Sequence, residues 1–319
     1  MRTAIPLTVM LASALACSLG TAPASARARV FVASYGNDEN PCTFGSPCKT
    51  FQQAVNVVDA GGEVTAIDSA GFGPISISKS VTITSPPGVE AGIVPTPGGI
   101  AIIIQNAGPT DTIVLRGLTI QGGGTGVDGI IVSSGANIEI VDCAIRGFVQ
   151  SGIIIDGQSA QMSLAIVNTV VADTKVGIDI EANSGSVRVA MDGVRVNNND
   201  YAGIILGAEN VFNLEASIAN SRIDNAGMNG LYISGNQGNM PIFAVAFLRN
   251  VTISQTPTAI NLNGNSVIYL SQVQQQAFFG FTNTAGINFT GTGNVAISDN
   301  TNHIQSNVVG GSLTPWGFQ

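Results

Sequence analysis

Short segments of alternating apolar and polar residues recur along most of the chain. Each begins at a small residue and places apolar side chains one and three positions later. The segments start at Gly129, Gly152, Gly177, Gly203, Gly230, Ala259 and Gly286. The successive steps are 23, 25, 26, 27, 29 and 27 residues. A repeat of this period with short alternating strands predicts a solenoid.

A second series keeps nearly the same phase and precedes the first by 9 to 12 residues. Its members are Gly117, Asp142, Asn168, Gly193, Asn220 and Asn250. Glycine, asparagine and aspartate tolerate left-handed backbone angles, so this position marks a corner between strands. No leucine ladder and no helical periodicity accompany the repeat, which argues against leucine-rich and ankyrin repeats. The sequence therefore predicts an all-β, right-handed parallel β-helix with coils of about 25 residues.

The segment that precedes the β-helix predicts a capping helix. Thr50 and Gln53 fit a capping box, and Gly61-Gly62 ends the segment. Apolar residues at helical spacing are Phe51, Ala54, Val55 and Val58. We expect this helix to cover the open first coil. At the far end the candidates for a cover are Phe278, Phe279, Phe281, Trp316 and Phe318.

Residues 1–28 have the pattern of a secretory signal: Arg2, an apolar stretch from Ala4 to Leu19, and a small-x-small site at Ala24–Ala26. We expect cleavage after Ala26 or Ala28 and an extracellular or periplasmic location. The alternative is a lipoprotein signal at Cys17, which the alanine three residues earlier disfavours. Beyond residue 28 no apolar stretch is long enough for a membrane span. The predicted organisation is a signal over 1–28, a strand, disulfide loop and capping helix over 29–62, and a continuous β-helix over 63–319.

Cysteine content and charge narrow the picture further. In an oxidising compartment we expect a disulfide between Cys42 and Cys48, whereas Cys143 falls on an inward position and is expected to be a buried hydrophobe. The net charge is -8 with only 12 lysines and arginines. Nucleic acids need clustered basic residues, so they are excluded as partners. Neutral or calcium-bridged glycans remain.

The opening of the mature chain resembles that of secreted bacterial β-helix proteins. The residues that carry the resemblance are Val30–Asp38, Pro41-Cys42, Ser46–Phe51 and Ala54. They are similar to the start of the right-handed parallel β-helix repeat proteins of the pectate-lyase-like (pectin lyase fold) superfamily. The resemblance implies an exported β-helix and a polysaccharide or cell-surface glycan as partner. It transfers no catalytic residue, because the family's Asp-Asp pair is missing and His303 stands between Asn302 and Ile304 instead of two glycines.

One acidic cluster emerges from the phase of the repeat. Residues two and four positions after the repeat glycine face outward, which places Asp156 and Glu181 on neighbouring coils and Asp179 beside them. The simplest interpretation is a solvated polar surface. The alternatives are a pair of catalytic carboxylates or a calcium site made by the three residues. Lys175 and Arg195 are the nearest cations, and Lys175 is a candidate base for a β-elimination.

A partly apolar outward stripe lies beside the acids. It consists of Ile131, Ile154, Ile205 and Tyr232. Such a stripe is typical of a contact with a loop, a second subunit or a sugar ring. Tyr232 and Asn261 are the candidate substrate-binding residues. The stretch Asn197–Asp200 predicts a turn whose asparagines stack along the solenoid.

Three functions fit these patterns. The first is an exported β-helix that binds an extracellular or cell-surface polysaccharide without cleaving it and requires no cofactor. The second is a polysaccharide lyase or glycoside hydrolase that acts through Asp156, Asp179 and Glu181, with calcium as the one ion these residues could hold. The third is a structural, oligomeric surface protein with the isoleucine stripe as its contact.

Overall fold

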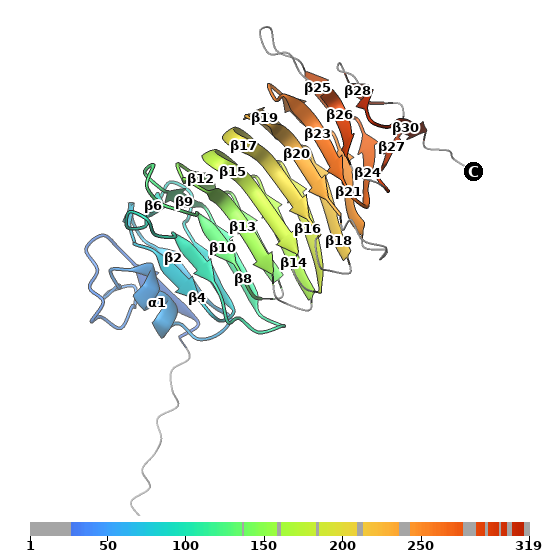
Figure 1. The fold of residues 1–319 in the computed structure, drawn as a ribbon. Coiled ribbons are helices and arrows are strands. Elements are labelled where there is room, and N and C mark those ends of the chain that lie inside the picture. The colour runs from blue at the N-terminus through green and yellow to red at the C-terminus, as the bar shows by residue number, and fades with distance from the viewer. Residues whose placement is uncertain are drawn as a thin grey trace, which may run out of the picture.

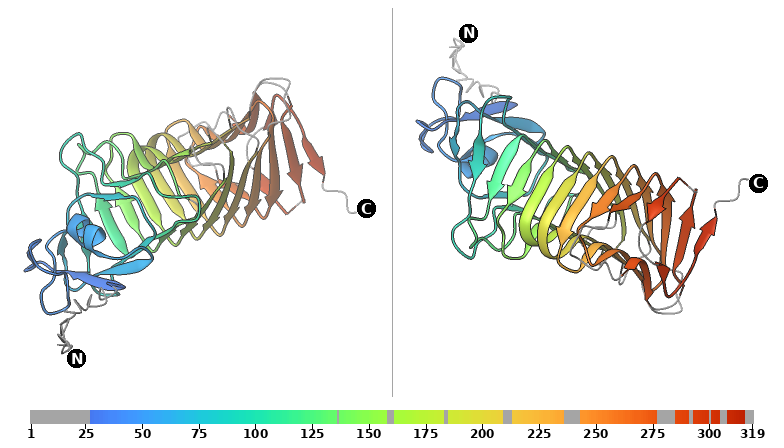
Figure 2. Two further views of the ribbon diagram at one scale, coloured as in Figure 1. Left: turned by 90° about the horizontal axis from the view of Figure 1, so that it is seen from below. Right: turned by 90° about the horizontal axis from the view of Figure 1, so that it is seen from above.

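Successive turns of the chain stack into a parallel β-solenoid. The computed structural model describes residues 27–135, 137–157, 161–182, 185–208, 213–235, 243–276, 285–290, 293–299, 301–304 and 308–315. Colour runs continuously from one end of the rod to the other, so the order of the turns follows the sequence (Figures 1 and 2). In the middle of the rod Ile153, Ile178, Ile204 and Leu231 are successive partners, with steps of 25, 26 and 27 residues. The predicted parallel β-helix is confirmed.

Each complete turn adds one strand to a first sheet. In spatial order its strands are β1 (Arg29–Val32), β2 (Gly62–Ala66), β5 (Val81–Thr84), β8 (Thr112–Arg116), β11 (Asn137–Val141), β14 (Gln161–Val167), β16 (Ser186–Asp192), β18 (Asn213–Ala219), β21 (Phe243–Arg249), β24 (Ser266–Ser271), β27 (Val295–Ser298) and β30 (Leu313–Pro315). All pairings are parallel. This is the arrangement expected when every turn returns to the same sheet.

The second sheet has two ladders of strands, which we call the short-strand facet and the glycine facet. The short-strand facet contains β3 (Ala70–Gly71), β6 (Ala91–Ile93), β9 (Leu118–Gln121), β12 (Ala144–Arg146), β19 (Arg222–Ala226), β22 (Thr252–Ser254), β25 (Gln274–Gln276) and β28 (His303–Ile304). The glycine facet contains β4 (Ile75–Ile77), β7 (Ile102–Ile104), β10 (Ile130–Val132), β13 (Ser151–Gly157), β20 (Asn229–Ser234), β23 (Thr258–Asn263), β26 (Ala285–Thr290) and β29 (Val308–Val309). Two long strands, β15 (Val170–Ala182) and β17 (Arg195–Gly207), run through both facets.

Corners between the first sheet and the short-strand facet lie where the second sequence series predicts them. Gly117, Asp142, Asn168, Gly193, Asn220 and Asn250 all have positive φ, between 49° and 70°. The asparagines also bond along the solenoid: the Asn250 amide donates to Asn220 Oδ1 at 2.9 Å. Backbone conformation and side-chain bonding therefore both select the residue type at this corner.

The glycines of the first series serve a different purpose. Gly203 does not have a positive φ, but a Cβ at this position would stand 2.5 Å from Ile223 Cγ2 and 2.7 Å from the Gly230 carbonyl oxygen. Gly152, Gly177 and Gly230 are equally crowded. Glycine recurs here because the bend between the two facets brings neighbouring coils too close for any side chain.

Apolar side chains one and three positions after these glycines fill the interior. Ile178 and Ile180 of β15 are fully buried, as are their register partners Ile204 and Leu206 of β17. Cys143 is also buried, as predicted, and its thiol is not part of a disulfide. Its surroundings raise the thiol pKa to about 11, because burial disfavours the thiolate.

The asparagine-rich stretch makes the predicted turn but also sends one side chain inward. Asn198 has φ of 56°, and its amide donates to Asp173 Oδ1 while its carbonyl accepts from the Asn225 amide. Asn199 is buried instead, and its amide donates to Thr174 Oγ1 at 2.7 Å. A run of polar residues in the sequence does not reveal that Asn199, which follows the left-handed Asn198, points into the core.

The N-terminal cap is formed by α1 (Phe51–Val57), which lies at the first end of the rod (Figure 1). Thr50 Oγ1 accepts from the Gln53 backbone N–H, as predicted. The reciprocal half of the capping box is replaced, because the Thr50 N–H donates to Asp38 Oδ1. The helix ends at Val57 with Val58 as its cap, so the expected stop at Gly61 is three residues too late. The Phe51 ring packs on Phe72 with ring centroids 4.9 Å apart.

The predicted disulfide joins Cys42 and Cys48, and both residues are buried beside this cap. The remaining terminal features lie elsewhere. The signal sequence as far as Ala26, and the aromatic residues proposed for the far end, lie outside the described residues. Within the described part of the chain, α1 is the longest helix, and its seven residues fall well short of a bilayer span.

Candidate functional site

The outward side of the glycine facet carries one continuous column of side chains, which we call the Asp179 column. Its members pair in register from strand to strand. In order they are Ile103, Ile131, Ile154, Asp179, Ile205, Tyr232, Asn261 and Asn288. The predicted isoleucine stripe is therefore real, and Asp179 lies inside it.

Asp179 is not the solvated carboxylate that an outward strand position predicts. Its register partners are Ile154 and Ile205, and its Oδ1 is buried without a hydrogen-bond partner among the described residues. Burial raises the pKa of this carboxyl to about 7, and the charges of Glu181 and Asp128 add to the shift. Asp179 thus titrates close to neutral pH, where most carboxyls are fully ionised.

Asp128 belongs to the same site but does not stand out in the sequence. It directly precedes the repeat glycine Gly129, is 8% exposed, and accepts a bond from the Ser151 N–H at 2.8 Å. Burial raises the pKa of Asp128, although that hydrogen bond opposes the rise. The available signal was an acid in the position before a repeat glycine, where the other coils carry Ser151, Val176, Ala202 and Asn229.

Asp156 and Glu181 lie side by side on neighbouring strands, as the repeat phase predicts. Glu181 and Asp179 also lie two residues apart on one face of β15. These placements do not gather the three carboxylates around one point. Among the described residues, no group of three His, Cys, Asp or Glu side chains is positioned to hold a metal ion. The geometry gives the calcium interpretation no support.

The two predicted cations lie away from Asp179. Lys175 is exposed, and its Nζ lies 3.5 Å from Gln150 Oε1 on the preceding turn. Arg195 begins β17 on the short-strand facet, in register with Val170 and Arg222. The charges that act on Asp179 come from carboxylates, so a role for Lys175 as its catalytic partner finds no support here.

The candidate binding residues form a linked polar row further along the column. Tyr232 and Asn261 are register partners, and the Asn263 amide donates to the Tyr232 hydroxyl at 2.9 Å. The Asn261 amide donates to Asn229 Oδ1 at 3.2 Å, and the Thr290 hydroxyl donates to Asn261 Oδ1 at 3.4 Å. These bonds cross from strand to strand and fix donors and acceptors at the spacing of the coils, about 4.8 Å.

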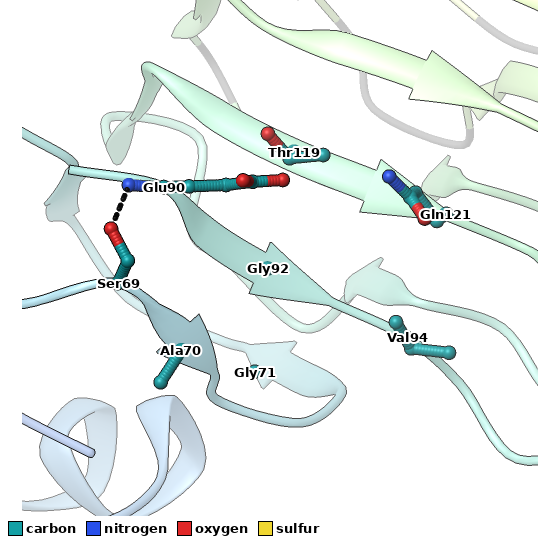
Figure 3. Close-up of a pocket in the computed structure, with 8 residues that line it drawn as sticks. All are labelled: Ser69, Ala70, Gly71, Glu90, Gly92, Val94, Thr119 and Gln121. Carbon is teal, nitrogen blue, oxygen red and sulfur yellow. Dashed lines mark hydrogen bonds between the residues drawn. The ribbon is translucent and has the colours of Figure 1, made fainter. Parts of the chain in front are cut away.

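A separate hollow of about 300 Å³ lies over the short-strand facet near the first end of the rod (Figure 3). Gly71 and Gly92 are in register and leave its floor without side chains. Glu90 and Gln121 line it, and the Glu90 N–H donates to Ser69 Oγ at 2.9 Å. The hollow belongs to a different strand ladder from Asp179, and the sequence pattern did not single it out.

Comparison with known proteins gives the fold. No family model and no curated protein matches the chain. An alginate lyase from Paenibacillus sp. str. FPU-7 is 15% identical with a TM-score of 0.65, covering 89% of this chain and 99% of its own. Pectate lyase Pel9A is 14% identical with a TM-score of 0.60, covering 90% and 77%. XylC in complex with xylose is 9% identical with a TM-score of 0.56, covering 82% and 68%. The chain therefore has the pectin lyase-like fold.

Proposed function

We propose that this protein is an exported β-solenoid that binds a neutral polysaccharide along the glycine facet without cleaving it. The observation that carries the proposal is the linked polar row. Tyr232, Asn261 and Asn288 lie on successive strands of the column, and Asn263 and Thr290 lie on successive strands of the next outward row, so each row repeats polar groups at the spacing of the coils. A polymer of sugars repeats its hydroxyls in the same way, so a regular surface can contact several units at once.

The neighbouring apolar residues suit the same ligand. Sugar rings have apolar faces of C–H groups and polar edges of hydroxyls. Ile205 and the ring of Tyr232 are half-buried and adjacent in register, and they offer apolar surface beside the polar row. This mixture of a mainly apolar lining with a few fixed polar groups is typical of small-molecule sites.

Charge favours a neutral polymer over an acidic one. The facet carries Asp128, Asp156, Asp179 and Glu181, and the whole chain has a net charge of -8. An acidic polysaccharide would bring like charges together, which costs binding energy unless cations intervene.

The signal pattern of residues 1–28 and the disulfide between Cys42 and Cys48 both support export. Disulfides persist in oxidising compartments, so an extracellular or periplasmic location is the natural place for this chain. Polysaccharides of the cell surface are available there.

The test is retardation of the mature protein in native gels that contain one polymer each: xylan, β-glucan, galactomannan, polygalacturonate or alginate. We expect retardation by at least one neutral polymer and its loss in Tyr232→Ala. The matched control is Tyr35→Ala, because Tyr35 is 67% exposed in the N-terminal loop, away from the glycine facet. Retardation only by acidic polymers, or equal loss in both variants, would contradict the proposal.

A second candidate, glycoside hydrolysis, is favoured by the pair Asp179 and Glu181. With a pKa of about 7, a large fraction of Asp179 is protonated near neutral pH and can act as a general acid. Glu181 is exposed two residues away on the same face. Two residues of strand separate the two Cα atoms by about 6.6 Å, and this backbone spacing is compatible with the carboxyl separation of about 6.5 to 9.5 Å in inverting glycosidases. In that reaction Asp179 protonates the leaving oxygen while Glu181 takes a proton from the attacking water.

Release of reducing ends from the same polymers separates the two candidates. Binding predicts none. Hydrolysis predicts release that disappears in Asp179→Asn and in Glu181→Gln but survives in Glu39→Gln, an exposed carboxylate of the N-terminal loop.

A further inference from the structure

A second hollow lies on the outer face of the first sheet, away from the glycine facet. Its volume is about 290 Å³. Its outward side chains come from three consecutive strands, β16, β18 and β21. These strands lie side by side in Figure 1. The side chains are Ser186, Arg188, Asn213, Glu215, Val245 and Phe247. The volume is at the lower end of ligand sites, which suits one small ring and not a folded peptide.

An aromatic ring forms one wall of this hollow. Phe247 is 40% exposed and stacks on Tyr269 of the next strand, with ring centroids 4.7 Å apart and planes within 9° of parallel. Since Tyr269 takes one face of the ring, the other face is directed along the solenoid toward the preceding strands. The register partners there are Ser217 and then Ala190, which are too small to cover it.

Polar groups of a different kind stand beside the ring. Arg188 Nε and Glu215 Oε2 are 3.7 Å apart, on neighbouring strands, and both side chains are more than half exposed. A guanidinium has five N–H donors and a carboxylate has two acceptor oxygens, so this one contact leaves positions for ligand hydroxyls. Asn213 also lines this hollow. Opposite charges side by side also make the site neutral overall.

We propose that this hollow is a separate binding site for one neutral pyranose residue. The apolar C–H face of the sugar lies on the free face of Phe247, and its hydroxyls bond to Arg188, Glu215 and Asn213. Aromatic rings suit ligands with one apolar face and a polar edge. The inference shares with the proposed function only its ligand class, because the two sites are on different sheets.

The competing account is that Phe247 and Tyr269 only tie neighbouring coils together. Stacked aromatic pairs across strands stabilise sheets. That account explains the stack but not why the free face of Phe247 is bordered by two small residues and a mixed ion pair. It also predicts no response of this face to sugars.

Methyl NMR of the mature protein separates the two sites in one titration with xylohexaose or cellohexaose. The Val245 methyls report on the hollow, and the Ile205 methyl reports on the glycine facet. We expect the Val245 signals to shift on titration and the apparent affinity at Val245 to fall about tenfold in Phe247→Ala. The matched control is Phe44→Ala, since Phe44 is another exposed phenylalanine at 66%.

A second variant keeps the ring and blocks its free face. Ser217→Leu places a larger side chain against Phe247, and Ser217 is exposed, so the fold should tolerate it. We expect the same loss at Val245. No shift at Val245 with either sugar, or a shift that both variants retain, overturns this proposal. Shifts at Ile205 alone would support the proposed function and contradict this second site. Shifts at Val245 alone would support this second site and contradict the proposed function.

Discussion

Asp179 and Glu215 are outward carboxylates near the middle of the same solenoid, yet they have opposite surroundings. Asp179 stands between Ile154 and Ile205 on the glycine facet, with Oδ1 buried and a pKa raised to about 7. Glu215 stands between Arg188 and Val245 on the first sheet, more than half exposed and paired with Arg188. Alternation along a strand assigns both to the outside.

The difference shows that neighbours along the column decide how an outward residue is hydrated. In a parallel solenoid each side chain has partners about 4.8 Å away on both sides, and these exclude or admit water. Two isoleucines desolvate a carboxylate and so destabilise its charged form. Arg188 and open solvent leave Glu215 hydrated, as is usual for a surface ion pair. A functional site is expected where a carboxylate stands between apolar partners, as Asp179 does.

The largest expected effect comes from breaking the register on which both columns depend. Gly203→Val puts a Cβ within 2.7 Å of a backbone oxygen of the next coil, so it should destabilise the protein by more than about 4 kcal/mol. Gly207→Val is the control in the same strand, because a Cβ there meets nothing closer than 3.7 Å. Urea unfolding of both variants tests this. Equal stability of the two would show that close approach does not select the repeat glycine.

Asp179→Asn removes the desolvated charge from the glycine facet. The pKa of the Asp179 carboxyl rises from 3.8 to about 7 on folding. The free energy of unfolding of the wild type therefore falls as the pH rises through that interval. The variant should therefore match the wild type near pH 4 and exceed it at pH 8 by about 2 to 4 kcal/mol. Unfolding curves across this pH range provide the measurement. A difference that does not grow with pH would place Asp179 in water.

Glu215→Gln should have the smallest effect. Exposed ion pairs contribute about 0 to 1 kcal/mol and weaken in salt, so the variant should change the free energy of unfolding by less than about 1 kcal/mol. Repeating the measurement in 1 M NaCl should abolish even that difference. A larger, salt-insensitive loss would mean that the Arg188–Glu215 pair holds the sheet together.

Sequence periodicity predicts the fold well because each signal has one structural cause. Left-handed corners demand residues such as Asn220, and interior rows demand apolar residues such as Ile178. The site is predicted less well. The stacking of Asp156 on Glu181 follows from the repeat, but the burial of Asp179 depends on residues 25 or more positions away. Asp128 was missed for the same reason, since the bend beside Gly129 covers a position that alternation alone cannot assign.

A crystal structure of the mature protein with xylohexaose would show whether sugars bind along the Asp179 column. We expect sugar density along the glycine facet, over Ile205 and Tyr232, with hydroxyls bonded to Asn261 and Asn263. An empty glycine facet in crystals whose sugar lies elsewhere on the solenoid would contradict the proposed function.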